Sequence, residues 1–238
     1  MSVLHRGRDD SRLRATTWRG DPAVAQIVTR GPVTEAEVVT ALDDLRRRGC
    51  ATVLTAALPP AEQSPFLALG FHEHERLHLL RRGVEPIRPR RSVEPRLRRF
   101  RRPDLPAVLG VDHLAFPTFW RFDGAAIDDA VAATPAARFR VVVAPGADEP
   151  VGYAITGRSG SRGYLQRLAV HPARRRAGLA TELIDDGLRW LRRWGGREVL
   201  VNTQESNAGA LALYEAVGFD RQPHGLAVLR LDLSAAER

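Results

Sequence analysis

The chain has a single cysteine, Cys50, and no lysine among its 238 residues. One cysteine excludes an intramolecular disulfide and a thiolate metal cluster, so a reducing cytoplasm is the expected compartment. No apolar run approaches the ~18–20 residues that a membrane helix needs. The N-terminus also lacks the apolar stretch of a secretory signal. We therefore expect a cytoplasmic globular protein with no membrane partner.

The charge of the chain is carried by arginine alone. Arginine supplies all 36 basic residues against 28 acidic ones, which gives a net charge of +8 and an isoelectric point near 11.0. A positive chain attracts anions such as nucleic acid, phosphates or nucleotide cofactors, and it attracts polycationic small substrates poorly. A Walker phosphate-binding loop is excluded because its lysine is missing.

A helix–strand–helix–strand pattern occurs twice, roughly 147 residues apart. In the first copy the segment 42–49 precedes a short apolar run, and a helix-like segment later ends in Gly70-Phe71. In the second copy the segment 188–195 corresponds to 42–49, and Gly218-Phe219 corresponds to Gly70-Phe71. A chance similarity of amphipathic segments is the alternative to a true repeat.

An arginine- and proline-rich segment, 88–102, separates the two copies. Eight of its fifteen residues are arginine, which is typical of a solvated linker that runs into an edge strand. A nucleic-acid footprint is the alternative, but Phe100 is its only aromatic residue for base stacking. The expected organisation is a partial copy at 1–87, a linker at 88–94 and a complete domain at 95–238.

The second copy alternates between strand and helix patterns. Strands are expected at 137–143, 151–155, 164–170, 199–201 and 226–231, and helices at 104–122, 124–133, 179–194 and 207–216. The helix at 179–194 carries an apolar stripe, an acidic start and a basic end, with Asp185 and Arg189 spaced to pair. Turns are expected around 145–148 and around Gly157, Gly160 and Gly163.

The run Arg174-Arg175-Arg176-Ala177-Gly178 lies between a strand and the start of that long helix. The start of a helix already carries about half a positive charge, so three arginines there call for an anion. Exposed N–H groups around Gly178, which has no Cβ, would form a pyrophosphate cradle. The alternative is a solvated basic turn with no ligand.

Two motifs resemble those of the GNAT (GCN5-related N-acetyltransferase) superfamily. Arg175-x-x-Gly178-x-Ala180 is similar to its Arg/Gln-x-x-Gly-x-Gly/Ala signature, and 207–219 is similar to its later Asn-x-x-Ala-x-x-Leu-Tyr-x-x-x-Gly-Phe motif. The resemblance covers about 95–233. It implies an α/β fold with a mixed, V-split central sheet flanked by helices, and an acetyl-CoA-dependent transfer of an acetyl group to a primary amine.

The resemblance also implies the site residues. Pyrophosphate contacts are expected from the loop and first helical turn, namely Arg175, Arg176, Ala177, Gly178, Leu179, Ala180 and Thr181. Main-chain groups of Leu168, Ala169 and Val170 would hold the pantetheine arm and polarise the thioester carbonyl. Tyr214 would protonate the leaving thiolate, or would be a packed aromatic residue instead. Asn207 would line the pantetheine channel, cap a helix, or do both.

The base that deprotonates the amine is left open. Some relatives carry a glutamate on the strand before the asparagine motif, where this chain has Val201-Asn202-Thr203-Gln204. Glu205, Asp123 and His113 are the candidates, with relayed water as the alternative. The segment 113–123, which contains four aromatic residues, would wall an acceptor pocket or pack in the core. The histidines at 72, 74 and 78 lack matching acids, so no metal site is expected.

The first copy is expected to be degenerate. Pro32 stands where Gly178 stands, Thr34 and Glu37 form a capping box, and Phe66 replaces the tyrosine. The expected partner is an amine-bearing small molecule or a protein N-terminus, with the chain a monomer or homodimer and nucleic acid an unlikely partner. The alternative function is a non-catalytic acyl-CoA-binding or regulatory module that contacts nucleic acid through the linker.

Overall fold

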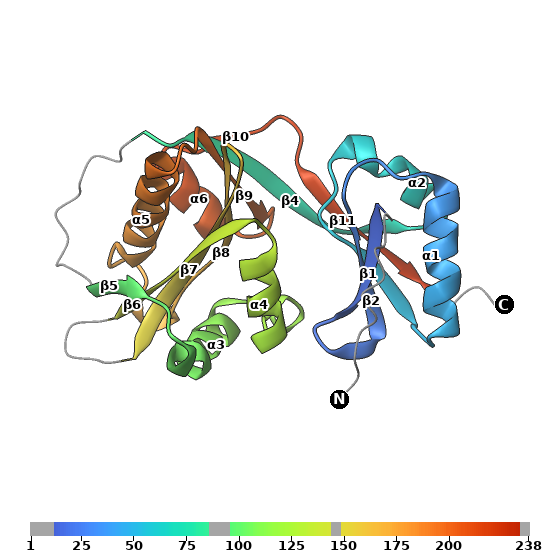
Figure 1. Ribbon diagram of the computed structural model, residues 1–238, viewed down its shortest axis with the longest axis horizontal. Helices are drawn as coiled ribbons and strands as arrows, with labels where there is room; N and C mark the ends of the chain where they lie inside the picture. The colour runs from blue at the N-terminus through green and yellow to red at the C-terminus, as the bar shows by residue number, and fades with distance from the viewer. Residues whose placement is uncertain (1–11, 86–95, 144–148, 234–238) are drawn as a thin grey trace. The chain divides into compact units, whose positions relative to one another are not determined.

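The computed structural model describes residues 12–85, 96–143 and 149–233. The chain divides into two compact units (Figure 1). Unit 1 comprises residues 1–77 and 223–238, and unit 2 runs from His78 to Gln222. Within the described ranges, no helix is long and apolar enough to cross a membrane.

Unit 1 is a sheet with helices packed on it. Its strands lie in the order β1 (Leu13–Trp18), β2 (Asp21–Thr29), β3 (Thr52–Thr55), β11 (Leu226–Asp232) and the beginning of β4 (His72–Gly83). Its helical segments are α1 (Glu35–Arg47), a 3₁₀ turn η1 (Pro60–Glu62) and α2 (Ser64–Leu67). Strands β2 and β3 are parallel, and the other neighbours are antiparallel.

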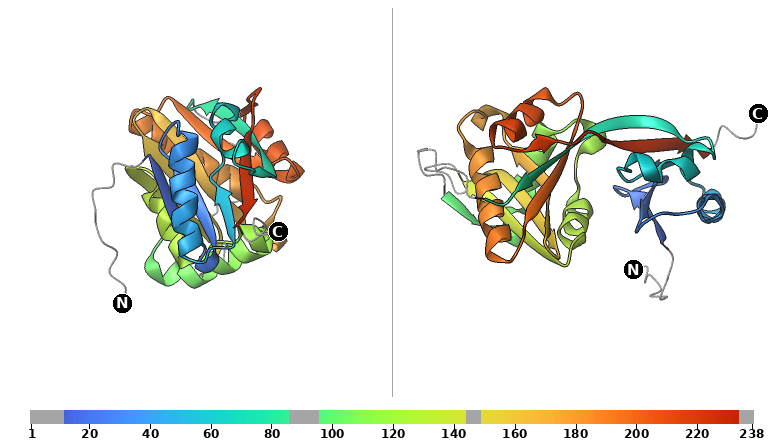
Figure 2. Two further views of the ribbon diagram at one scale, coloured as in Figure 1. Left: turned by 90° about the vertical axis from the view of Figure 1, so that its right-hand side faces the viewer. Right: turned by 90° about the horizontal axis from the view of Figure 1, so that it is seen from above.

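Helix α1 begins at the predicted capping box. The Thr34 hydroxyl accepts from the Glu37 N–H at 3.3 Å, and the Glu37 carboxylate accepts from the Thr34 N–H at 2.7 Å. The helix lies against the sheet of this unit (Figure 2). Its residues Val38, Leu42 and Leu45 are buried in the apolar core. The start of this helix is therefore satisfied internally, which confirms the sequence-based expectation.

The final strands of the two repeats do not stay within their own units. Strand β11, from the end of the chain, lies between β3 and β4 in unit 1, where Ala227 and Leu229 join the apolar core. Strand β4 begins in unit 1, and its residues from His78 onward belong to unit 2, where β10 (Asp220–Arg221) pairs with Leu80 and Arg81. The compact units therefore do not follow the linear division at the linker, of which residues 88–95 lie outside the described ranges.

Unit 2 is built on a mixed sheet. Its strands lie in the order β4, β9 (Glu198–Gln204), β8 (Arg162–Val170), β7 (Pro150–Ser159), β6 (Ala136–Val143) and β5 (Arg96–Arg99). Strands β5 to β8 are antiparallel neighbours, whereas β8 and β9 run parallel. The linker thus runs into an edge strand, β5, as the sequence predicted.

Helices cover both faces of this sheet (Figure 1). Helices α3 (Leu105–Ala115) and α4 (Gly124–Ala132) pack on one face, and α5 (Leu179–Arg193) and α6 (Ala208–Ala216) pack on the other. Three 3₁₀ turns, η2 (Arg102–Asp104), η3 (Thr118–Trp120) and η4 (Pro172–Arg174), connect them. The predicted fold class, a mixed sheet flanked by helices, is confirmed.

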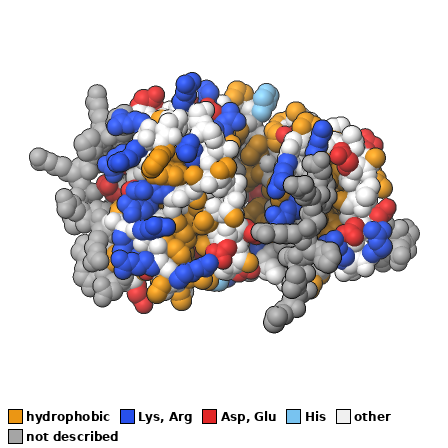
Figure 3. Space-filling model, viewed as in Figure 1, with side chains coloured by type: hydrophobic (Ala, Val, Ile, Leu, Met, Phe, Trp, Pro, Cys, Tyr) orange, Lys and Arg blue, Asp and Glu red, His pale blue; other side chains and the backbone are white. Residues whose placement is uncertain are grey.

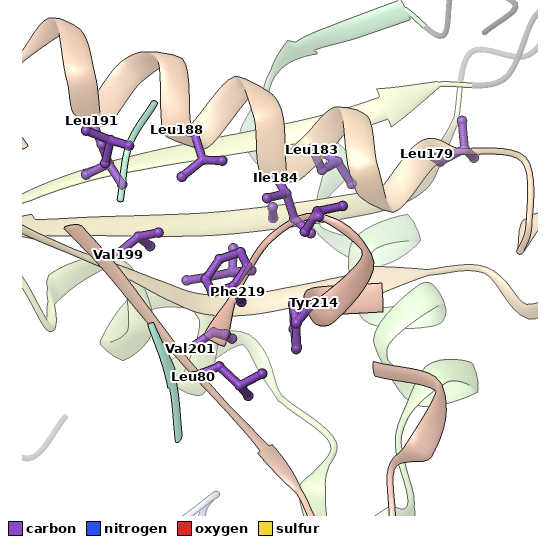
Figure 4. Packing of buried hydrophobic residues seen from close by; sticks show 14 of the residues in the cluster. Leu80, Leu179, Leu183, Ile184, Leu188, Leu191, Val199, Val201, Tyr214 and Phe219 are labelled. Atoms are coloured by element: carbon purple, nitrogen blue, oxygen red, sulfur yellow. The ribbon is translucent and has the colours of Figure 1, made fainter. Parts of the chain in front are cut away.

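Helix α5 carries the predicted apolar stripe. Leu183, Ile184, Leu188 and Leu191 are buried against the sheet with Val199 and Phe219 (Figure 4). The helix lies so close to β8 that a Cβ at Gly163 would collide with the Leu191 side chain. On the opposite side, Asp185 and Arg189 form the predicted ion pair at 2.8 Å.

Two predicted features differ from the structure. The helix predicted at 104–122 ends at Ala115, because Phe116 precedes Pro117 and is held in an extended conformation. Of the three predicted turn glycines, only Gly160 lies in the turn, whereas Gly157 and Gly163 lie within β7 and β8. The turn predicted at 145–148 lies outside the described residues.

An ion pair joins the edge strand β5 to the η2 turn that precedes α3. The Arg98 guanidinium donates to both carboxylate oxygens of Asp104 at 2.7 Å, and Asp104 also accepts from the Arg101 N–H at 2.7 Å. The side chains of Arg98 and Asp104 are 18% and 10% exposed. The hydrogen bonds from Arg98, joined by the Arg101 N–H, lower the pKa of Asp104 against the opposing effect of burial.

This pair predicts an acid-sensitive contribution to stability. A carboxylate whose folded pKa is lowered stabilises the fold above its unfolded pKa near 4, and the contribution is lost as pH falls through the folded pKa. We expect Asp104→Asn to lower the free energy of unfolding by on the order of 2 kcal/mol at pH 7. Urea denaturation at pH 7 and pH 3 measures it, and the difference between wild type and variant should shrink at pH 3. An equal difference at both pH values would contradict the prediction.

Candidate functional site

The arginine loop before α5 has an unusual backbone. Arg176 and Gly178 both adopt the left-handed conformation, with φ of 65° and 79°. All residues from Pro172 to Gly178 are exposed. Only Ala177 separates these two residues. A tight turn of this kind directs successive N–H groups toward one side, which is the arrangement of an anion-binding concavity.

The start of α5 leaves its N–H groups available. The last hydrogen bond of the η4 turn joins the Arg175 N–H to the Pro172 carbonyl at 3.3 Å, and the first hydrogen bond of the long helix joins the Glu182 N–H to the Gly178 carbonyl at 3.1 Å. The N–H groups between these two bonds are those that a helix start cannot satisfy itself. Within the described ranges, no acidic side chain pairs with Arg174, Arg175 or Arg176. The cradle predicted from the sequence therefore has the geometry and charge to bind a pyrophosphate.

The sheet splits next to this loop. Strand β8 pairs with β9 only from Arg162 to Tyr164, whereas it pairs with β7 as far as Val170. Beyond Tyr164, the edge of β8 that faced β9 has no strand partner in the part of the chain that the structure describes. The side chains of Leu168 and Val170 pack toward α5 and that of Ala169 toward α3, so the main chain remains to contact a ligand.

Tyr214 lies on α6 at the apolar centre of this face. Its side chain is 6% exposed and packs against the Phe219 ring, with centroids 5.6 Å apart, in a cluster that includes Leu80 and Val201 (Figure 4). Burial raises the pKa of the Tyr214 phenol, and the positive charge of Arg167 opposes that rise only in part. The phenol is therefore protonated at neutral pH, as a proton donor must be.

The other expected contacts lie at two helix starts. Leu179 is the first residue of α5 and is buried, with Ala180 and Thr181 half-buried behind it. Asn207 caps α6, its side-chain oxygen accepting from the Ala210 N–H at 3.1 Å. The capping role proposed for Asn207 is confirmed, and its place in a pantetheine channel stays a prediction.

The three base candidates differ in how they are engaged. Asp123 caps α4 by accepting from the Ala126 N–H at 2.7 Å, and the Nε2 of His113 lies 2.9 Å from the Phe122 carbonyl oxygen. Glu205 follows β9 and is half-exposed, with its Oε1 4.0 Å from the Nδ1 of His78. Glu205 is therefore the candidate whose carboxylate is least committed to structure. No group of three or more metal-ligating side chains occurs among the residues described.

A buried charge network, which the sequence analysis missed, holds the aromatic segment 116–122. Arg167 of β8 donates to Asp112 of α3 at 2.8 and 3.0 Å and to the Trp120 carbonyl at 2.7 Å. Its guanidinium lies 3.4 Å from the centroid of the Phe116 ring and 3.8 Å from that of Phe122. Two rings of the segment therefore pack against the Arg167 guanidinium, which comes from the strand β8 that separates from β9.

The carboxylate of Asp112 is the centre of this network. It is fully buried, and it also accepts from the Tyr153 hydroxyl at 2.5 Å and the Phe122 N–H at 2.7 Å. A sequence signal was present, since an aspartate within an otherwise apolar helical stretch needs a partner when buried. The partner, however, lies 55 residues later.

Removing this carboxylate should destabilise the protein strongly. We expect Asp112→Ala to lower the free energy of unfolding by about 3–5 kcal/mol, because Arg167 is left buried and uncompensated. Chemical denaturation at neutral pH measures the loss. The matched control is Asp128→Asn, which breaks an exposed pair with Arg102 and should cost less than about 1 kcal/mol. Equal losses for the two variants would contradict the assigned burial energetics.

The family match lies within unit 2. Residues 105–219 match the family model described as the Acetyltransferase (GNAT) family. The mycothiol acetyltransferase of Geodermatophilus obscurus is 42% identical over 59 residues, which are 25% of this chain and 19% of that protein. The N-alpha-acetyltransferase MAK3 of Arabidopsis thaliana is 40% identical over 60 residues, which are 25% of this chain and 32% of that protein. The matched segments thus span less than half of either relative.

Solved structures share the fold over most of the chain. A tandem GNAT protein from the clavulanic acid biosynthesis pathway aligns with a TM-score of 0.67 at 16% identity, covering 89% of this chain and 76% of that one. A GCN5-related N-acetyltransferase from Sphaerobacter thermophilus aligns with a TM-score of 0.60 at 18% identity, covering 93% and 76%. The tandem neighbour agrees with a second, degenerate GNAT-like copy in the N-terminal half. Residues 105–219 therefore resemble the Acetyltransferase (GNAT) family, and the chain shares the fold of solved proteins of that kind.

Proposed function

We propose that this protein is an acetyl-CoA-dependent N-acetyltransferase that acetylates a primary amine. The observation that carries the proposal is the loop before α5, where two left-handed residues and three exposed arginines surround a helix start. A pyrophosphate is the ligand that such a cationic concavity fits. The split of β8 from β9 beside this loop gives an extended ligand arm an open strand edge to follow.

The loop would bind the pyrophosphate of acetyl-CoA through main-chain N–H groups from Arg176 to Thr181. Arg175 and Arg176 add charge-assisted hydrogen bonds, which are stronger than neutral ones. Acetyl-CoA supplies an acetyl group activated as a thioester. With the pyrophosphate fixed, the main chain at Leu168, Ala169 and Val170 is placed to hold the pantetheine arm, and Asn207 to line its channel.

The residues of this chain would then manage position and protons. The open edge of β8 orients the thioester carbonyl and polarises it through N–H donation. The amine nitrogen forms a bond to the carbonyl carbon, the carbon–sulfur bond breaks, and the Tyr214 hydroxyl gives its proton to the departing sulfur. Glu205, through water, takes the proton that the amine loses. The Tyr214 phenol is protonated at neutral pH, as this role requires, and its burial makes it a weaker acid than an exposed phenol.

The N-terminal unit is proposed to hold no cofactor. Thr34 and Glu37 cap the start of its helix α1, so side chains of the protein itself take the place that an anion would occupy there. At the position equivalent to Tyr214 it carries Phe66, which is fully buried against Phe71 and has no proton to donate. Its proposed role is structural support, since it takes up the final strand of the chain.

The activity is tested by incubating the purified protein with acetyl-CoA and a panel of primary amines. The panel includes small amines, amino sugars and peptides with free N-termini. The expected result is release of free thiol in step with an acetylated product detected by mass spectrometry. Cofactor binding without turnover on any acceptor would contradict the enzyme and favour a non-catalytic acyl-CoA-binding module.

A further inference from the structure

The outer strands of unit 2 leave a short piece of sheet edge open. Strand β5 pairs with β6 only from Arg99 opposite Arg140 to Arg96 opposite Val143. The last contact is the Phe100 N–H to the Phe139 carbonyl at 3.2 Å. Residues Ala136 to Arg138 pair with β7 on one side, and among the described residues no strand covers their other side.

The main chain of Ala137 faces this open side. Successive residues of an antiparallel strand direct their N–H and C=O groups alternately to the two neighbouring strands. Because the Phe139 carbonyl points toward the β5 side, the N–H and C=O of Ala137 point the same way. Such an exposed edge is a template for an added strand.

A groove of about 480 Å³ follows this open edge, within the size range of ligand sites. We call it the β6 edge groove. On one side of the sheet it is lined by Phe100 and Phe139, stacked with centroids 4.0 Å apart, and by Ile127 and Val131. Arg99, Arg138 and Arg140 line the other side with Trp190 of α5. Arg102 and Asp128, which form an ion pair with each other at 3.1 Å, also line the groove beside Ile127. The groove thus has one largely apolar wall, whose two charges are paired, and one cationic wall.

The cationic wall carries more positive charge than its neighbours neutralise. Arg99 and Arg140 are directly opposite each other across the two strands, where like charges are unfavourable. Asp186 of α5 serves both Arg138, at 2.6 and 2.9 Å, and Arg140, at 3.2 Å. No acid in the described ranges pairs with Arg99, so the Asp186 carboxylate is shared by Arg138 and Arg140 and leaves the charge of Arg99 unneutralised. Arginine side chains are prominent over this part of unit 2 (Figure 3).

We propose that the β6 edge groove binds an acidic peptide segment of a partner protein as an added, extended strand. Alternate side chains of such a strand face opposite sides of the sheet. Acidic residues at every second position would meet Arg99, Arg138 and Arg140, and the apolar residues between them would meet Phe100 and Phe139. The main chain of the peptide would hydrogen-bond to Ala137, as in strand addition generally.

A single-stranded nucleic acid fits this groove less well. Its binding relies on bases that stack on exposed aromatic faces. The rings of Phe100 and Phe139 already stack on each other with an interplanar angle of 5°, so each has lost one face. The open strand edge offers a peptide backbone partners that a sugar–phosphate backbone does not use in this way.

The test measures binding of an octapeptide that alternates glutamate and valine. Its N-terminus is acetylated, so it carries no amine for the catalytic site, and failure here is distinct from failure of the proposed enzyme. Fluorescence polarisation with a dye-labelled peptide should show binding that weakens as salt is raised. Arg99→Glu should weaken binding about 10-fold or more, because it reverses the unpaired charge of the cationic wall. Ala137→Pro removes the edge N–H without touching the pairing with β7, and it should weaken binding as well.

The control is Arg192→Glu, the same charge reversal at an exposed position of α5 outside the groove, which should change the affinity less than about 2-fold. If Ala137→Pro fails to fold, the comparison of Arg99→Glu with Arg192→Glu decides. Three results would overturn the proposal. They are equal binding of a glutamine–valine peptide, equal weakening by the two charge reversals, and binding of an oligouridylate, but not the acidic peptide, that depends on Arg99.

Discussion

Tyr214→Phe is expected to lower the rate of acetyl transfer by about 100-fold or more, with little change in the affinity for acetyl-CoA. The substitution removes one hydroxyl and keeps the ring that packs on Phe219, so the apolar cluster should hold. Without that hydroxyl, water must protonate the leaving thiolate instead. Steady-state kinetics give the rate, and calorimetric titration gives the affinity.

The matched control is Tyr164→Phe. Tyr164 lies on the paired part of β8, opposite Leu200 of β9, before the strands split. The control variant should keep the wild-type rate within about 2-fold. A Tyr214→Phe variant that turns over as fast as this control would show that Tyr214 is a packed aromatic residue and that the proton comes from elsewhere.

Gly178→Val is expected to weaken acetyl-CoA binding by about 100-fold, which corresponds to the loss of charge-assisted hydrogen bonds in the cradle. Gly178 has φ of 79°, a conformation that a β-branched residue adopts only with strain. The valine would both distort the loop and place a side chain where a phosphate oxygen approaches the main chain. Calorimetry or ligand-dependent thermal shift measures the change.

A second variant separates charge from backbone shape. The double substitution Arg175→Ala and Arg176→Ala should weaken binding by 10-fold or more, on the order of one to several charged hydrogen bonds. Arg192→Ala with Arg193→Ala removes the same charge from the opposite, exposed end of α5 and should leave the affinity nearly unchanged. If both double variants weaken binding alike, only the overall charge matters and the loop is not the pyrophosphate site.

Local features of the fold could be predicted because each depends on residues close in the sequence. The apolar stripe of α5, its Asp185–Arg189 pair and the capping box at Thr34 follow from helical spacing alone. The loop at Gly178 was likewise predictable, since its arginines and its glycine are contiguous. In these places the physical cause and its effect lie within one turn of chain.

Features that depend on distant residues could not be predicted. The two repeats indicated two similar units, but nothing in their period shows that β11 belongs to unit 1 or that β4 is divided between the two units. The pairing of Asp112 with Arg167, and the sharing of Asp186 by two arginines of β6, join elements that only the fold brings together. In a chain with 36 arginines, the sequence offers too many possible partners for each buried acid.

The open edge of β6 also could not be predicted from the sequence, because it depends on how far a neighbouring strand extends. Its sequence, Ala136-Ala137-Arg138-Phe139, predicts a strand, and nothing in it indicates that the neighbouring strand β5 is too short to cover it. The split of β8 from β9 is also a matter of pairing, and it became an expectation only through the family resemblance.

Calorimetric titration of acetyl-CoA into the protein decides whether the arginine loop is the cofactor site. We expect one bound equivalent per chain, lost in Gly178→Val and retained in Arg192→Ala with Arg193→Ala. One site is expected because the N-terminal unit closes its own helix start with Thr34 and Glu37. Absence of binding, or a second bound equivalent that survives Gly178→Val, would contradict a single cofactor site at this loop.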